Sequence, residues 1–422
     1  MSTLILPART VPVAGAFDVV VAGGGPAGFS AAVCAARQGA RTLLVEQAGQ
    51  VGGVATTGLM SHWTGNTKGG FYEEILDRSC VPGASRVTID PERLKLTMLD
   101  MLDEAGAETL LYAFCAEALM EDGRVAGVVT QSKSGAQAWR GKVVVDATGD
   151  GDIAASAGAA FTKGRETDGK MQPVTLMFKI GGVDLERAIL PGSFETRVEV
   201  PHGEIQTLAR AQLPHPAGHV LLYKGSAPGV VTCNMTNAVD IDGTRAKDLT
   251  RGEKECRRQM PRIIAFLREH APGYETCYAL SSASIIGVRE TRHFKGLYTL
   301  TEDDILAARV FPDWVVTRAH FNFDIHSLKG PGLDEHGVQH GFKQEEGYTI
   351  PYRCLVPEKV DGLLLAGRCI SGTHKAHSNF RVMPICANMG QAAGIAAALA
   401  VKLNCQPRDV PVEEIQKRIT AS

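Results

Sequence analysis

Apolar and polar residues near the start of the chain follow the pattern of alternating strands and helices. The apolar run 17–22 predicts a strand, residues 27–38 an alanine-rich helix, and residues 41–46 a second strand. A further helix is expected over 90–104, where Asp90 is a favourable N-cap and the apolar residues share one face. The fold is therefore expected to begin with a βαβ unit.

The same α/β pattern returns at the end of the chain, whereas the middle differs. Residues 362–366 read as a strand and 384–403 as a helix, while 171–345 mix a polar helix with long loop-like stretches. We therefore predict an α/β fold with a discontinuous first domain, made of residues 1–170 and 346–422. Residues 171–345 would form an inserted domain of mixed α+β structure.

Composition and charge exclude several classes of function. The chain has 422 residues, with 44% hydrophobic and 21% charged residues, as in ordinary globular proteins. A formal net charge of −2 gives no reason to expect nucleic acid or an anionic membrane as a partner. No apolar run is expected to approach the roughly 18 residues of a membrane span. We therefore expect no nucleic-acid and no membrane partner, and leave a homo-oligomer open.

Ten cysteines are scattered without a CxxC pair and without the spacing of metal ligands. This pattern is typical of reduced, mostly buried thiols in a cytosolic protein. The first residues lack the basic and long apolar regions of a signal peptide. We accordingly expect a cytoplasmic protein with no bound metal.

A glycine-rich turn between the first strand and the first helix carries the strongest chemical signal. Gly23, Gly25 and Gly28 fit the GxGxxG pattern, with Pro26 and Ala27 opening the helix. The three glycines allow a tight turn, close approach of a pyrophosphate and tight helix packing. Glu46 ends the next strand, where a carboxylate accepts ribose hydroxyls. An unoccupied glycine turn would rarely combine all of these features.

The fingerprint alone does not distinguish FAD from NAD, and two later segments bear on that choice. Residues 143–152 form an apolar strand that ends in a turn of small and acidic residues. Residues 363–369 repeat the strand-then-glycine theme near the C-terminus. Each segment alone would also fit an ordinary buried strand. Together they match the places where the chain of glutathione-reductase-like flavoproteins passes the cofactor.

With these segments, the sequence resembles the bacterial FAD-dependent oxidoreductases of the xanthan-lyase-like kind. The resemblance covers most of the chain and rests on motifs in a fixed order, at 146–152, 286–292, 323–326, 366–371, 381–384 and 389–394. It implies non-covalent FAD in a glutathione-reductase-like Rossmann domain with an inserted substrate domain. The further cofactor contacts that it implies are Gly53, Thr148, Gly149, Asp150, Gly367 and Arg368.

The helix 384–403 is expected to direct its N-terminus at the flavin. Pro384 suits the first helical position, and Met389 and Gly390 lie in a stretch crowded with small residues. A positive dipole end there would stabilise the negative charge that builds up when a flavin takes a hydride. Cys386 lies in the first turn, where we expect a buried, apolar thiol. A helix of small residues packed in a core is the plainer alternative.

The resemblance also brings a set of polar residues to the substrate. Arg289, Arg292 and Arg381 would hold a carboxylate or polarise an oxygen. His374 is our first expectation for the base and His326 the second, although either would also fit a structural role. The arginines at 289 and 292 would equally fit structural ion pairs.

The leading hypothesis is an FAD enzyme that oxidises a CH–OH or CH–NH group of a small polar molecule by hydride transfer to flavin. Oxygen or another carrier would take up the electrons, because the chain has neither a second GxGxxG nor a redox CxxC. A flavin monooxygenase that uses O2 and an external reductant is the alternative. A flavin-bearing RNA-binding protein is a third, against which the near-neutral charge argues. The short segment around His62 lacks the flanking pattern of a covalent flavin link.

Overall fold

The larger part of the molecule is built on a seven-stranded sheet with the order β3-β2-β1-β6-β5-β4, in which β17 also pairs with β6. The structure is a computed structural model that describes residues 10–421. The strands of this sheet are β1 (Val13–Ala22), β2 (Thr42–Val45), β3 (Glu108–Leu110), β4 (Phe114–Glu121), β5 (Arg124–Ser132), β6 (Gly135–Asp146) and β17 (Leu363–Leu365).

Four parallel strands carry the loops that matter for function. The register places Leu44, Val21, Val145 and Leu364 in one row across β2, β1, β6 and β17. All four side chains are fully buried, as expected for parallel strands covered on both faces. Because parallel strands end at the same edge, the loops after these four strands meet there. The antiparallel hairpin β4–β5 extends the sheet on the other side of β6.

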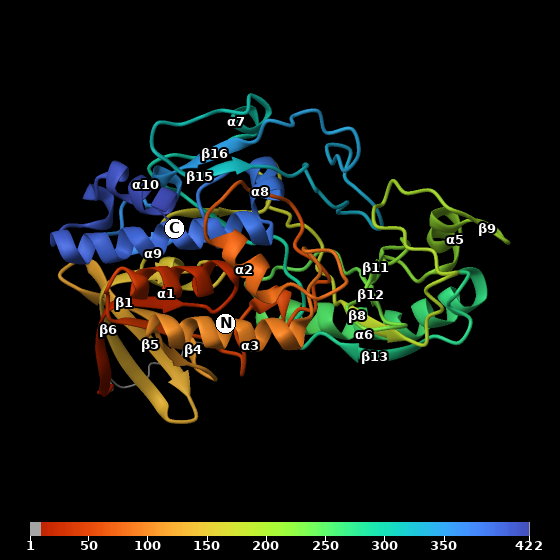
Figure 1. Ribbon diagram of the computed structural model, residues 1–422, viewed down its shortest axis with the longest axis horizontal. Coiled ribbons are helices and arrows are strands. Elements are labelled where there is room, and N and C mark those ends of the chain that lie inside the picture. The colour runs from red at the N-terminus through yellow and green to blue at the C-terminus, as the bar shows by residue number, and fades with distance from the viewer. Residues whose placement is uncertain (1–9, 422) are drawn as a thin grey trace.

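Helices cover the sheet (Figure 1). Two of them, Pro26–Arg37 (α1) and Met383–Leu403 (α9), are rich in alanine and glycine and pack against each other. The helices of this part are α1 (Pro26–Arg37), α2 (Phe71–Ser79), α3 (Pro91–Ala105), α4 (Asp152–Ser156), α9 (Met383–Leu403) and α10 (Val412–Ala421). The predicted N-cap is confirmed, because the Asp90 carboxylate accepts from the first backbone N–H groups of α3. The βαβ start predicted from residues 17–46 is likewise confirmed.

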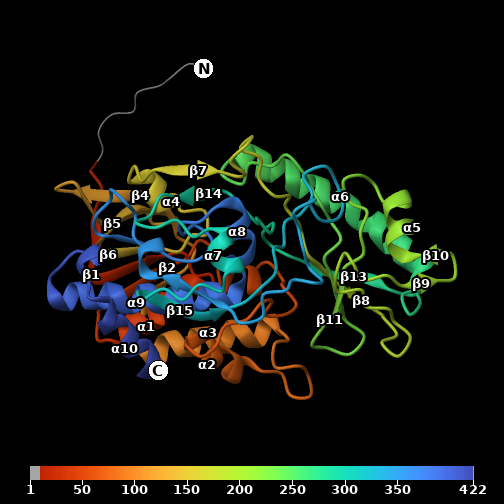
Figure 2. The same cartoon turned by 90° about the horizontal axis from the view of Figure 1, so that it is seen from above.

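A second part lies at the other end of the molecule (Figure 2). It is an antiparallel sheet of order β11-β12-β8-β13 with two helices and a small hairpin. Its elements are β8 (Phe178–Gly181), β9 (Glu199–Val200), β10 (Gly203–Glu204), α5 (Ile205–Gln212), β11 (Leu222–Lys224), β12 (Val231–Cys233), α6 (Ala246–His270) and β13 (Tyr278–Ser282). Its apolar side chains form a core of their own, from Phe178 to Cys277.

The remaining elements pack against the larger part. They are η1 (Gly53–Ala55), β7 (Phe161–Lys163), β14 (Arg292–Phe294), α7 (Glu302–Leu306), β15 (Trp314–Ala319), β16 (Tyr348–Pro351), η2 (Tyr352–Cys354), α8 (His374–Phe380) and η3 (Pro407–Asp409). Buried residues from Phe294 to Ile325 pack into the large core with the first and last segments of the chain. The two smaller hydrophobic cores contain buried residues only up to Ala283. The inserted domain was expected to extend much farther along the chain, to residue 345. The division into domains itself stays a prediction.

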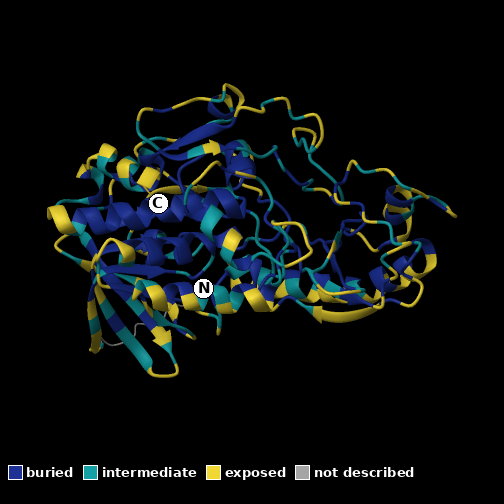
Figure 3. Ribbon diagram, in the orientation of Figure 1, coloured by how far each residue is buried: buried dark blue, intermediate teal, exposed yellow. Residues whose placement is uncertain are grey.

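The apolar helix α9 corrects one expectation. By length and composition it could span a membrane, contrary to our prediction that no apolar run reaches that length. Of its most apolar window, 94% is buried inside the protein, which is the position of a core helix (Figure 3). Among residues 10–421 no other helix meets the same criteria.

Candidate active site

One large cavity of about 1370 Å³ opens at the carboxyl edge of the parallel strands and extends toward the second part. The loops after β1, β2, β6 and β17 all contribute to its wall. Eleven of the predicted cofactor residues line it, namely Gly23, Gly25, Pro26, Ala27, Glu46, Gly53, Thr148, Gly149, Asp150, Gly367 and Arg368. Residues that are far apart in sequence thus share one cavity.

The glycines of the fingerprint differ in what surrounds them. A Cβ at Gly28 would lie 1.8 Å from the carbonyl oxygen of Gly23, so only glycine lets α1 pack on the turn. A Cβ at Gly25 would meet nothing within 4 Å and would project into open space at the cavity wall. Within the described part of the chain, no side chain caps the N-terminus of α1. The cavity wall thus combines a close backbone approach with an uncapped helix end, as an anionic pyrophosphate requires.

Glu46 is held at the cavity by two backbone hydrogen bonds. Its carboxylate accepts from the N–H groups of Gly24 and Ala48, each at 2.7 Å. Burial raises the pKa of Glu46, and these hydrogen bonds oppose that effect. Its position after β2 is the one in which a carboxylate accepts the ribose hydroxyls of a dinucleotide.

The loops after β6 and β17 are joined by an ion pair at the cavity wall. A guanidinium nitrogen of Arg368 lies 2.9 Å from a carboxylate oxygen of Asp150, which also accepts from the hydroxyl of Thr291. The other terminal nitrogen, Nη1 of Arg368, is buried and has no hydrogen-bond partner among the described residues. A buried cationic donor without a partner fits an anionic group of the cofactor. The residues present therefore suit FAD.

A second set of polar side chains lines the same cavity farther from the fingerprint. It consists of Arg289, Asp324, His326 and Arg381. One carboxylate oxygen of Asp324 accepts from Arg381 at 2.9 Å and lies 3.3 Å from Nε2 of His326, and the other accepts from the amide of Gln339 at 2.7 Å. Arg289 donates to the carbonyl of Pro173 at 2.6 Å.

Burial and the two arginines determine the charge states in this part of the cavity. Burial and the nearby Arg289 lower the pKa of His326 to about 4, so this imidazole is neutral at pH 7. Burial alone would raise the pKa of Asp324, but His326 and the two arginines hold it well below its ordinary range. Burial and Arg381 lower the pKa of Arg289 to about 10, which still leaves it charged. Two guanidinium charges therefore face one carboxylate.

Two residues expected near the substrate lie elsewhere. His374 does not line the cavity; its Nδ1 is 2.5 Å from Glu290, whose hydrogen bond raises the pKa of His374 against the effect of burial. Arg292 also lies outside the cavity wall and donates to the Asp150 carbonyl and to the carboxylate of Asp152. Tertiary partners therefore hold both side chains outside the wall of this cavity, and a direct role of either at the substrate stays a prediction.

Four expected cofactor residues also lie outside the cavity wall: Gly28, Pro384, Met389 and Gly390. A Cβ at Gly390 would lie 2.0 Å from the carbonyl oxygen of Ala27 in α1, and a Cβ at Gly394 2.2 Å from that of Ala31. The small residues of α9 therefore serve close packing on α1, which was the plainer alternative. The first turn of α9 does reach the cavity, through Met383 and Cys386. Burial raises the pKa of the Cys386 thiol to about 12, as expected for a buried, unreactive cysteine.

Asp324 is the functional residue that sequence reasoning missed. It lies two positions before His326 in a stretch without helix or strand, and its carboxylate contacts both the imidazole and Arg381. The Asp-x-His spacing within 323–326 was the available signal, since it allows the two side chains to meet locally. His62 also lines the cavity, and burial lowers its pKa.

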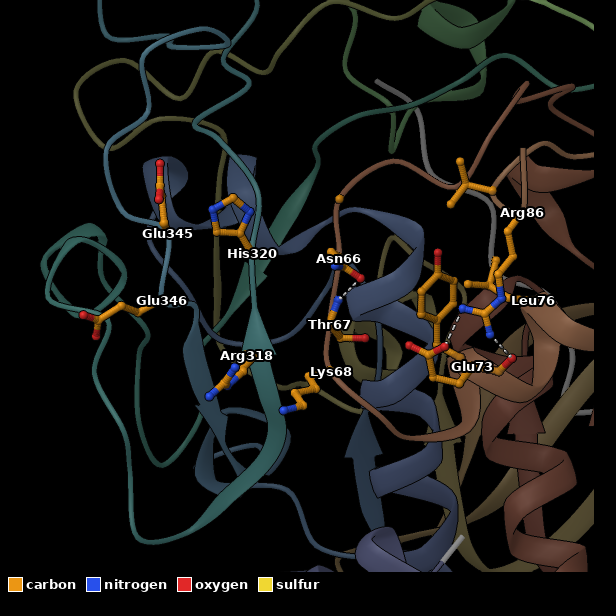
Figure 4. Close-up of a pocket in the computed structure, with 13 residues that line it drawn as sticks. Asn66, Thr67, Lys68, Glu73, Leu76, Arg86, Arg318, His320, Glu345 and Glu346 are labelled. Carbon is orange, nitrogen blue, oxygen red and sulfur yellow. Dashed lines mark hydrogen bonds and ion pairs between the residues drawn. The ribbon is translucent and has the colours of Figure 1, made fainter. Parts of the chain in front are cut away.

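A second cavity of about 690 Å³ lies next to the large one. The bridge between Asn66 and His320 belongs to its wall, while the neighbouring Thr64 and Phe321 line the large cavity. Figure 4 shows Arg86 paired with Glu73 on one side of it. None of the fingerprint residues contributes to this cavity, and its wall carries charges of both signs.

Comparison with known proteins agrees with this geometry. Parallel strands, a fingerprint turn and a cavity at their carboxyl edge define a dinucleotide-binding α/β fold. The chain belongs to the FAD dependent oxidoreductase family, whose model matches residues 18–419. It therefore binds FAD and is an oxidoreductase.

More distant relatives agree with the fold. The chain is 32% identical to digeranylgeranylglycerophospholipid reductase 1 of Methanopyrus kandleri over 149 residues, which are 32% of this chain and 40% of that protein. A geranylgeranyl bacteriochlorophyll reductase-like protein of Thermoplasma acidophilum aligns over 96% of this chain and 83% of its own, with 16% identity and a TM-score of 0.50. The flavin-dependent brominase Bmp2 aligns over 92% and 80%, with 13% identity and a TM-score of 0.51.

Proposed function

We propose that this enzyme oxidises a CH–OH or CH–NH group of a small organic acid, with transfer of a hydride equivalent to FAD. The observation that carries the proposal is the charge of Arg289. This guanidinium is half-buried at the cavity wall, where it donates to the Pro173 carbonyl, and among residues 10–421 no carboxylate lies within 4.0 Å of it. A partly desolvated charge without a carboxylate in direct contact is costly, and an anionic ligand in the cavity removes that cost. A carboxylate matches the planar fork of arginine.

His326 is the proposed base. It is neutral at pH 7 because its pKa is lowered to about 4, so it can accept the proton of the O–H or N–H group. Asp324, at 3.3 Å from Nε2, orients the ring and stabilises the imidazolium that forms. Arg381 holds Asp324 in place at 2.9 Å.

The step balances with the cofactor as the electron acceptor. The substrate C–H bond breaks with its electron pair, the X–H proton goes to His326, and a C=X double bond forms. FAD supplies the two-electron acceptor when it is bound. The first turn of α9 reaches the cavity and presents the positive end of a 21-residue helix, which favours developing negative charge there.

The test is anaerobic mixing of the purified protein with hydroxy acids, amino acids, sugars and glycosides, followed through the visible absorbance of the flavin. Acids should bleach the flavin, and the methyl ester of the best acid should bleach it far more weakly. Arg289→Gln should raise KM for the acid by about 10–100-fold, the equivalent of roughly 1.5–3 kcal/mol for a charged hydrogen bond. The matched control is Arg187→Gln, because Arg187 pairs with Glu275 in an exposed position.

If the acid and its methyl ester bleached the flavin equally, Arg289 would not bind the substrate carboxylate, but the proposed oxidation would still hold. Bleaching by NADPH alone would instead favour the monooxygenase alternative, in which an external reductant supplies the electrons. If Arg187→Gln raised KM for the acid as much as Arg289→Gln does, the effect would not be specific to the cavity.

Three narrower inferences accompany the proposal. The strand order and the fingerprint support a glutathione-reductase-like cofactor domain with an inserted substrate domain. The motifs of the sequence support the xanthan-lyase-like branch of the family. All ten cysteines are free thiols, which supports a reducing compartment and hence a cytoplasmic enzyme.

A further inference from the structure

Four buried side chains from two distant segments meet outside the wall of the large cavity. Glu290 lies two residues before β14 and His293 lies within that strand. His374 and His377 belong to α8, and Figure 2 labels both elements. Nε2 of His293 lies 2.8 Å, and Nδ1 of His374 lies 2.5 Å, from the same oxygen, Oε1, of Glu290. All four residues are buried, and His374 is the most exposed of them at 9%.

The spacing of these residues is that of two short ligand pairs. Glu290 and His293 are separated by two residues, and so are His374 and His377. On a helix, residues three apart lie on the same face, so α8 presents both imidazoles together. The sequence prediction of no metal considered the cysteines and did not combine these two pairs.

Two ring nitrogens in the cluster have no hydrogen-bond partner within residues 10–421. They are Nδ1 of His293 and Nδ1 of His377, and both are buried. The two rings pack edge to face with their centroids 4.7 Å apart. Buried polar atoms are normally satisfied, so an unpartnered imidazole nitrogen beside a carboxylate needs an explanation. A metal ion that accepts a nitrogen lone pair provides one.

We propose that Glu290, His293 and His377 bind a divalent zinc ion, with His374 as the fourth ligand. One potential ligand atom from each of the first three residues lies within 4.8 Å of the others. The ligand atoms of tetrahedral zinc lie about 3.3 Å apart, given bonds of about 2.0–2.1 Å, so modest side-chain shifts complete the site. Imidazole nitrogen and carboxylate oxygen are ligands that zinc accepts.

The surroundings favour a structural site. The backbone N–H of Gln172 donates to Oε2 of Glu290 at 2.9 Å, which fixes the carboxylate with Oε1 toward the histidines. Four buried protein ligands leave no open position for a reacting molecule. The ion would tie the segment that carries Arg289 to the helix that precedes Arg381. It would thereby fix the positions of Arg289 and Arg381 relative to each other in the large cavity.

The experiment measures metal in the full-length, tag-free protein with FAD bound. The protein is loaded with zinc, desalted and analysed by inductively coupled plasma mass spectrometry, and we expect about one zinc per chain. His377→Ala and the more conservative Glu290→Gln should each lose most of it. His336→Ala is the matched control, because His336 lies in an exposed Asp334–Glu335–His336 group and should leave the content unchanged.

X-ray absorption at the zinc edge gives a second readout that does not depend on the variants. We expect nitrogen and oxygen ligands at about 2.0–2.1 Å and no sulfur at about 2.3 Å. Wild-type protein that retains no zinc after loading would overturn the proposal. A sulfur shell would also overturn it, because cysteine thiolates would then be ligands. A His377→Ala variant that folds and keeps the wild-type zinc content would overturn it as well, because His377 would then not be a ligand.

Discussion

The two glycines at the N-terminus of α1 should respond in opposite ways to the same substitution. Gly25→Ala adds a methyl group that meets no atom of residues 10–421 within 4 Å. The backbone of Gly25 has φ −66°, which alanine adopts without strain. We therefore expect the FAD-free protein to keep its melting temperature, or to gain slightly, since replacing Gly at a compatible site stabilises by about 0.4–1 kcal/mol.

Gly25→Ala should instead weaken the binding of FAD. The methyl group occupies the part of the cavity where the pyrophosphate must approach the backbone. Overpacking typically costs about 1–3 kcal/mol, so the Kd for FAD should rise about 5–150-fold. Gly28→Ala should do the reverse. Its Cβ would lie 1.8 Å from a backbone oxygen, so the FAD-free protein itself should lose about 1–3 kcal/mol or more of stability.

The assay pairs two measurements on each variant. Thermal unfolding of the FAD-free protein reports stability, and titration with FAD followed by flavin fluorescence reports Kd. If Gly25→Ala binds FAD as tightly as the wild type, the pyrophosphate does not lie against this turn and the placement of the cofactor is wrong. If Gly28→Ala leaves the FAD-free protein as stable as the wild type, the close packing of α1 on the turn is not what the structure indicates.

Three further outcomes follow from the same structure. Because the pKa of His326 is lowered to about 4, the base is neutral above that value, and kcat/KM measured from about pH 4 to 8 should be flat at high pH and fall only near pH 4. A fall centred near the ordinary histidine pKa of about 6.5 would refute this assignment. Asp90→Ala should lower the free energy of unfolding by about 1 kcal/mol through loss of the α3 cap, with FAD affinity unchanged in titration. The Cys386 thiol, whose pKa is raised to about 12, should resist alkylation in the native protein and react after denaturation, as mass spectrometry can show.

The first part of the fold was predictable because its signals are local. The strand 17–22, the glycine turn and the helix 27–38 lie next to one another in sequence, and each agrees with the next. Glu46 could be placed at the cavity for the same reason, since it ends the following strand. Backbone geometry and strand register determine these positions with little help from distant residues.

The positions of the expected substrate-binding and flavin-facing residues were less predictable, because they depend on contacts with residues far away in the sequence. His374 was the first expectation for the base, but Glu290, 84 positions earlier, holds its ring outside the cavity. Gly390 was expected in the helix that faces the flavin, and the structure places it against the backbone of α1. No local pattern distinguishes these outcomes, because a small residue or a histidine has the same sequence signal whichever neighbour it meets.

The central claim is that electrons reach FAD from an organic substrate whose proton is taken by His326. The most direct test is anaerobic single-turnover reduction of the bound flavin by the best acid substrate, with hydrogen or deuterium at the carbon that is oxidised. The account predicts that the deuterated substrate bleaches the flavin more slowly, and that His326→Asn lowers the rate by about 10²–10⁴-fold. Equal rates for the two isotopes and an unimpaired His326→Asn variant would contradict it.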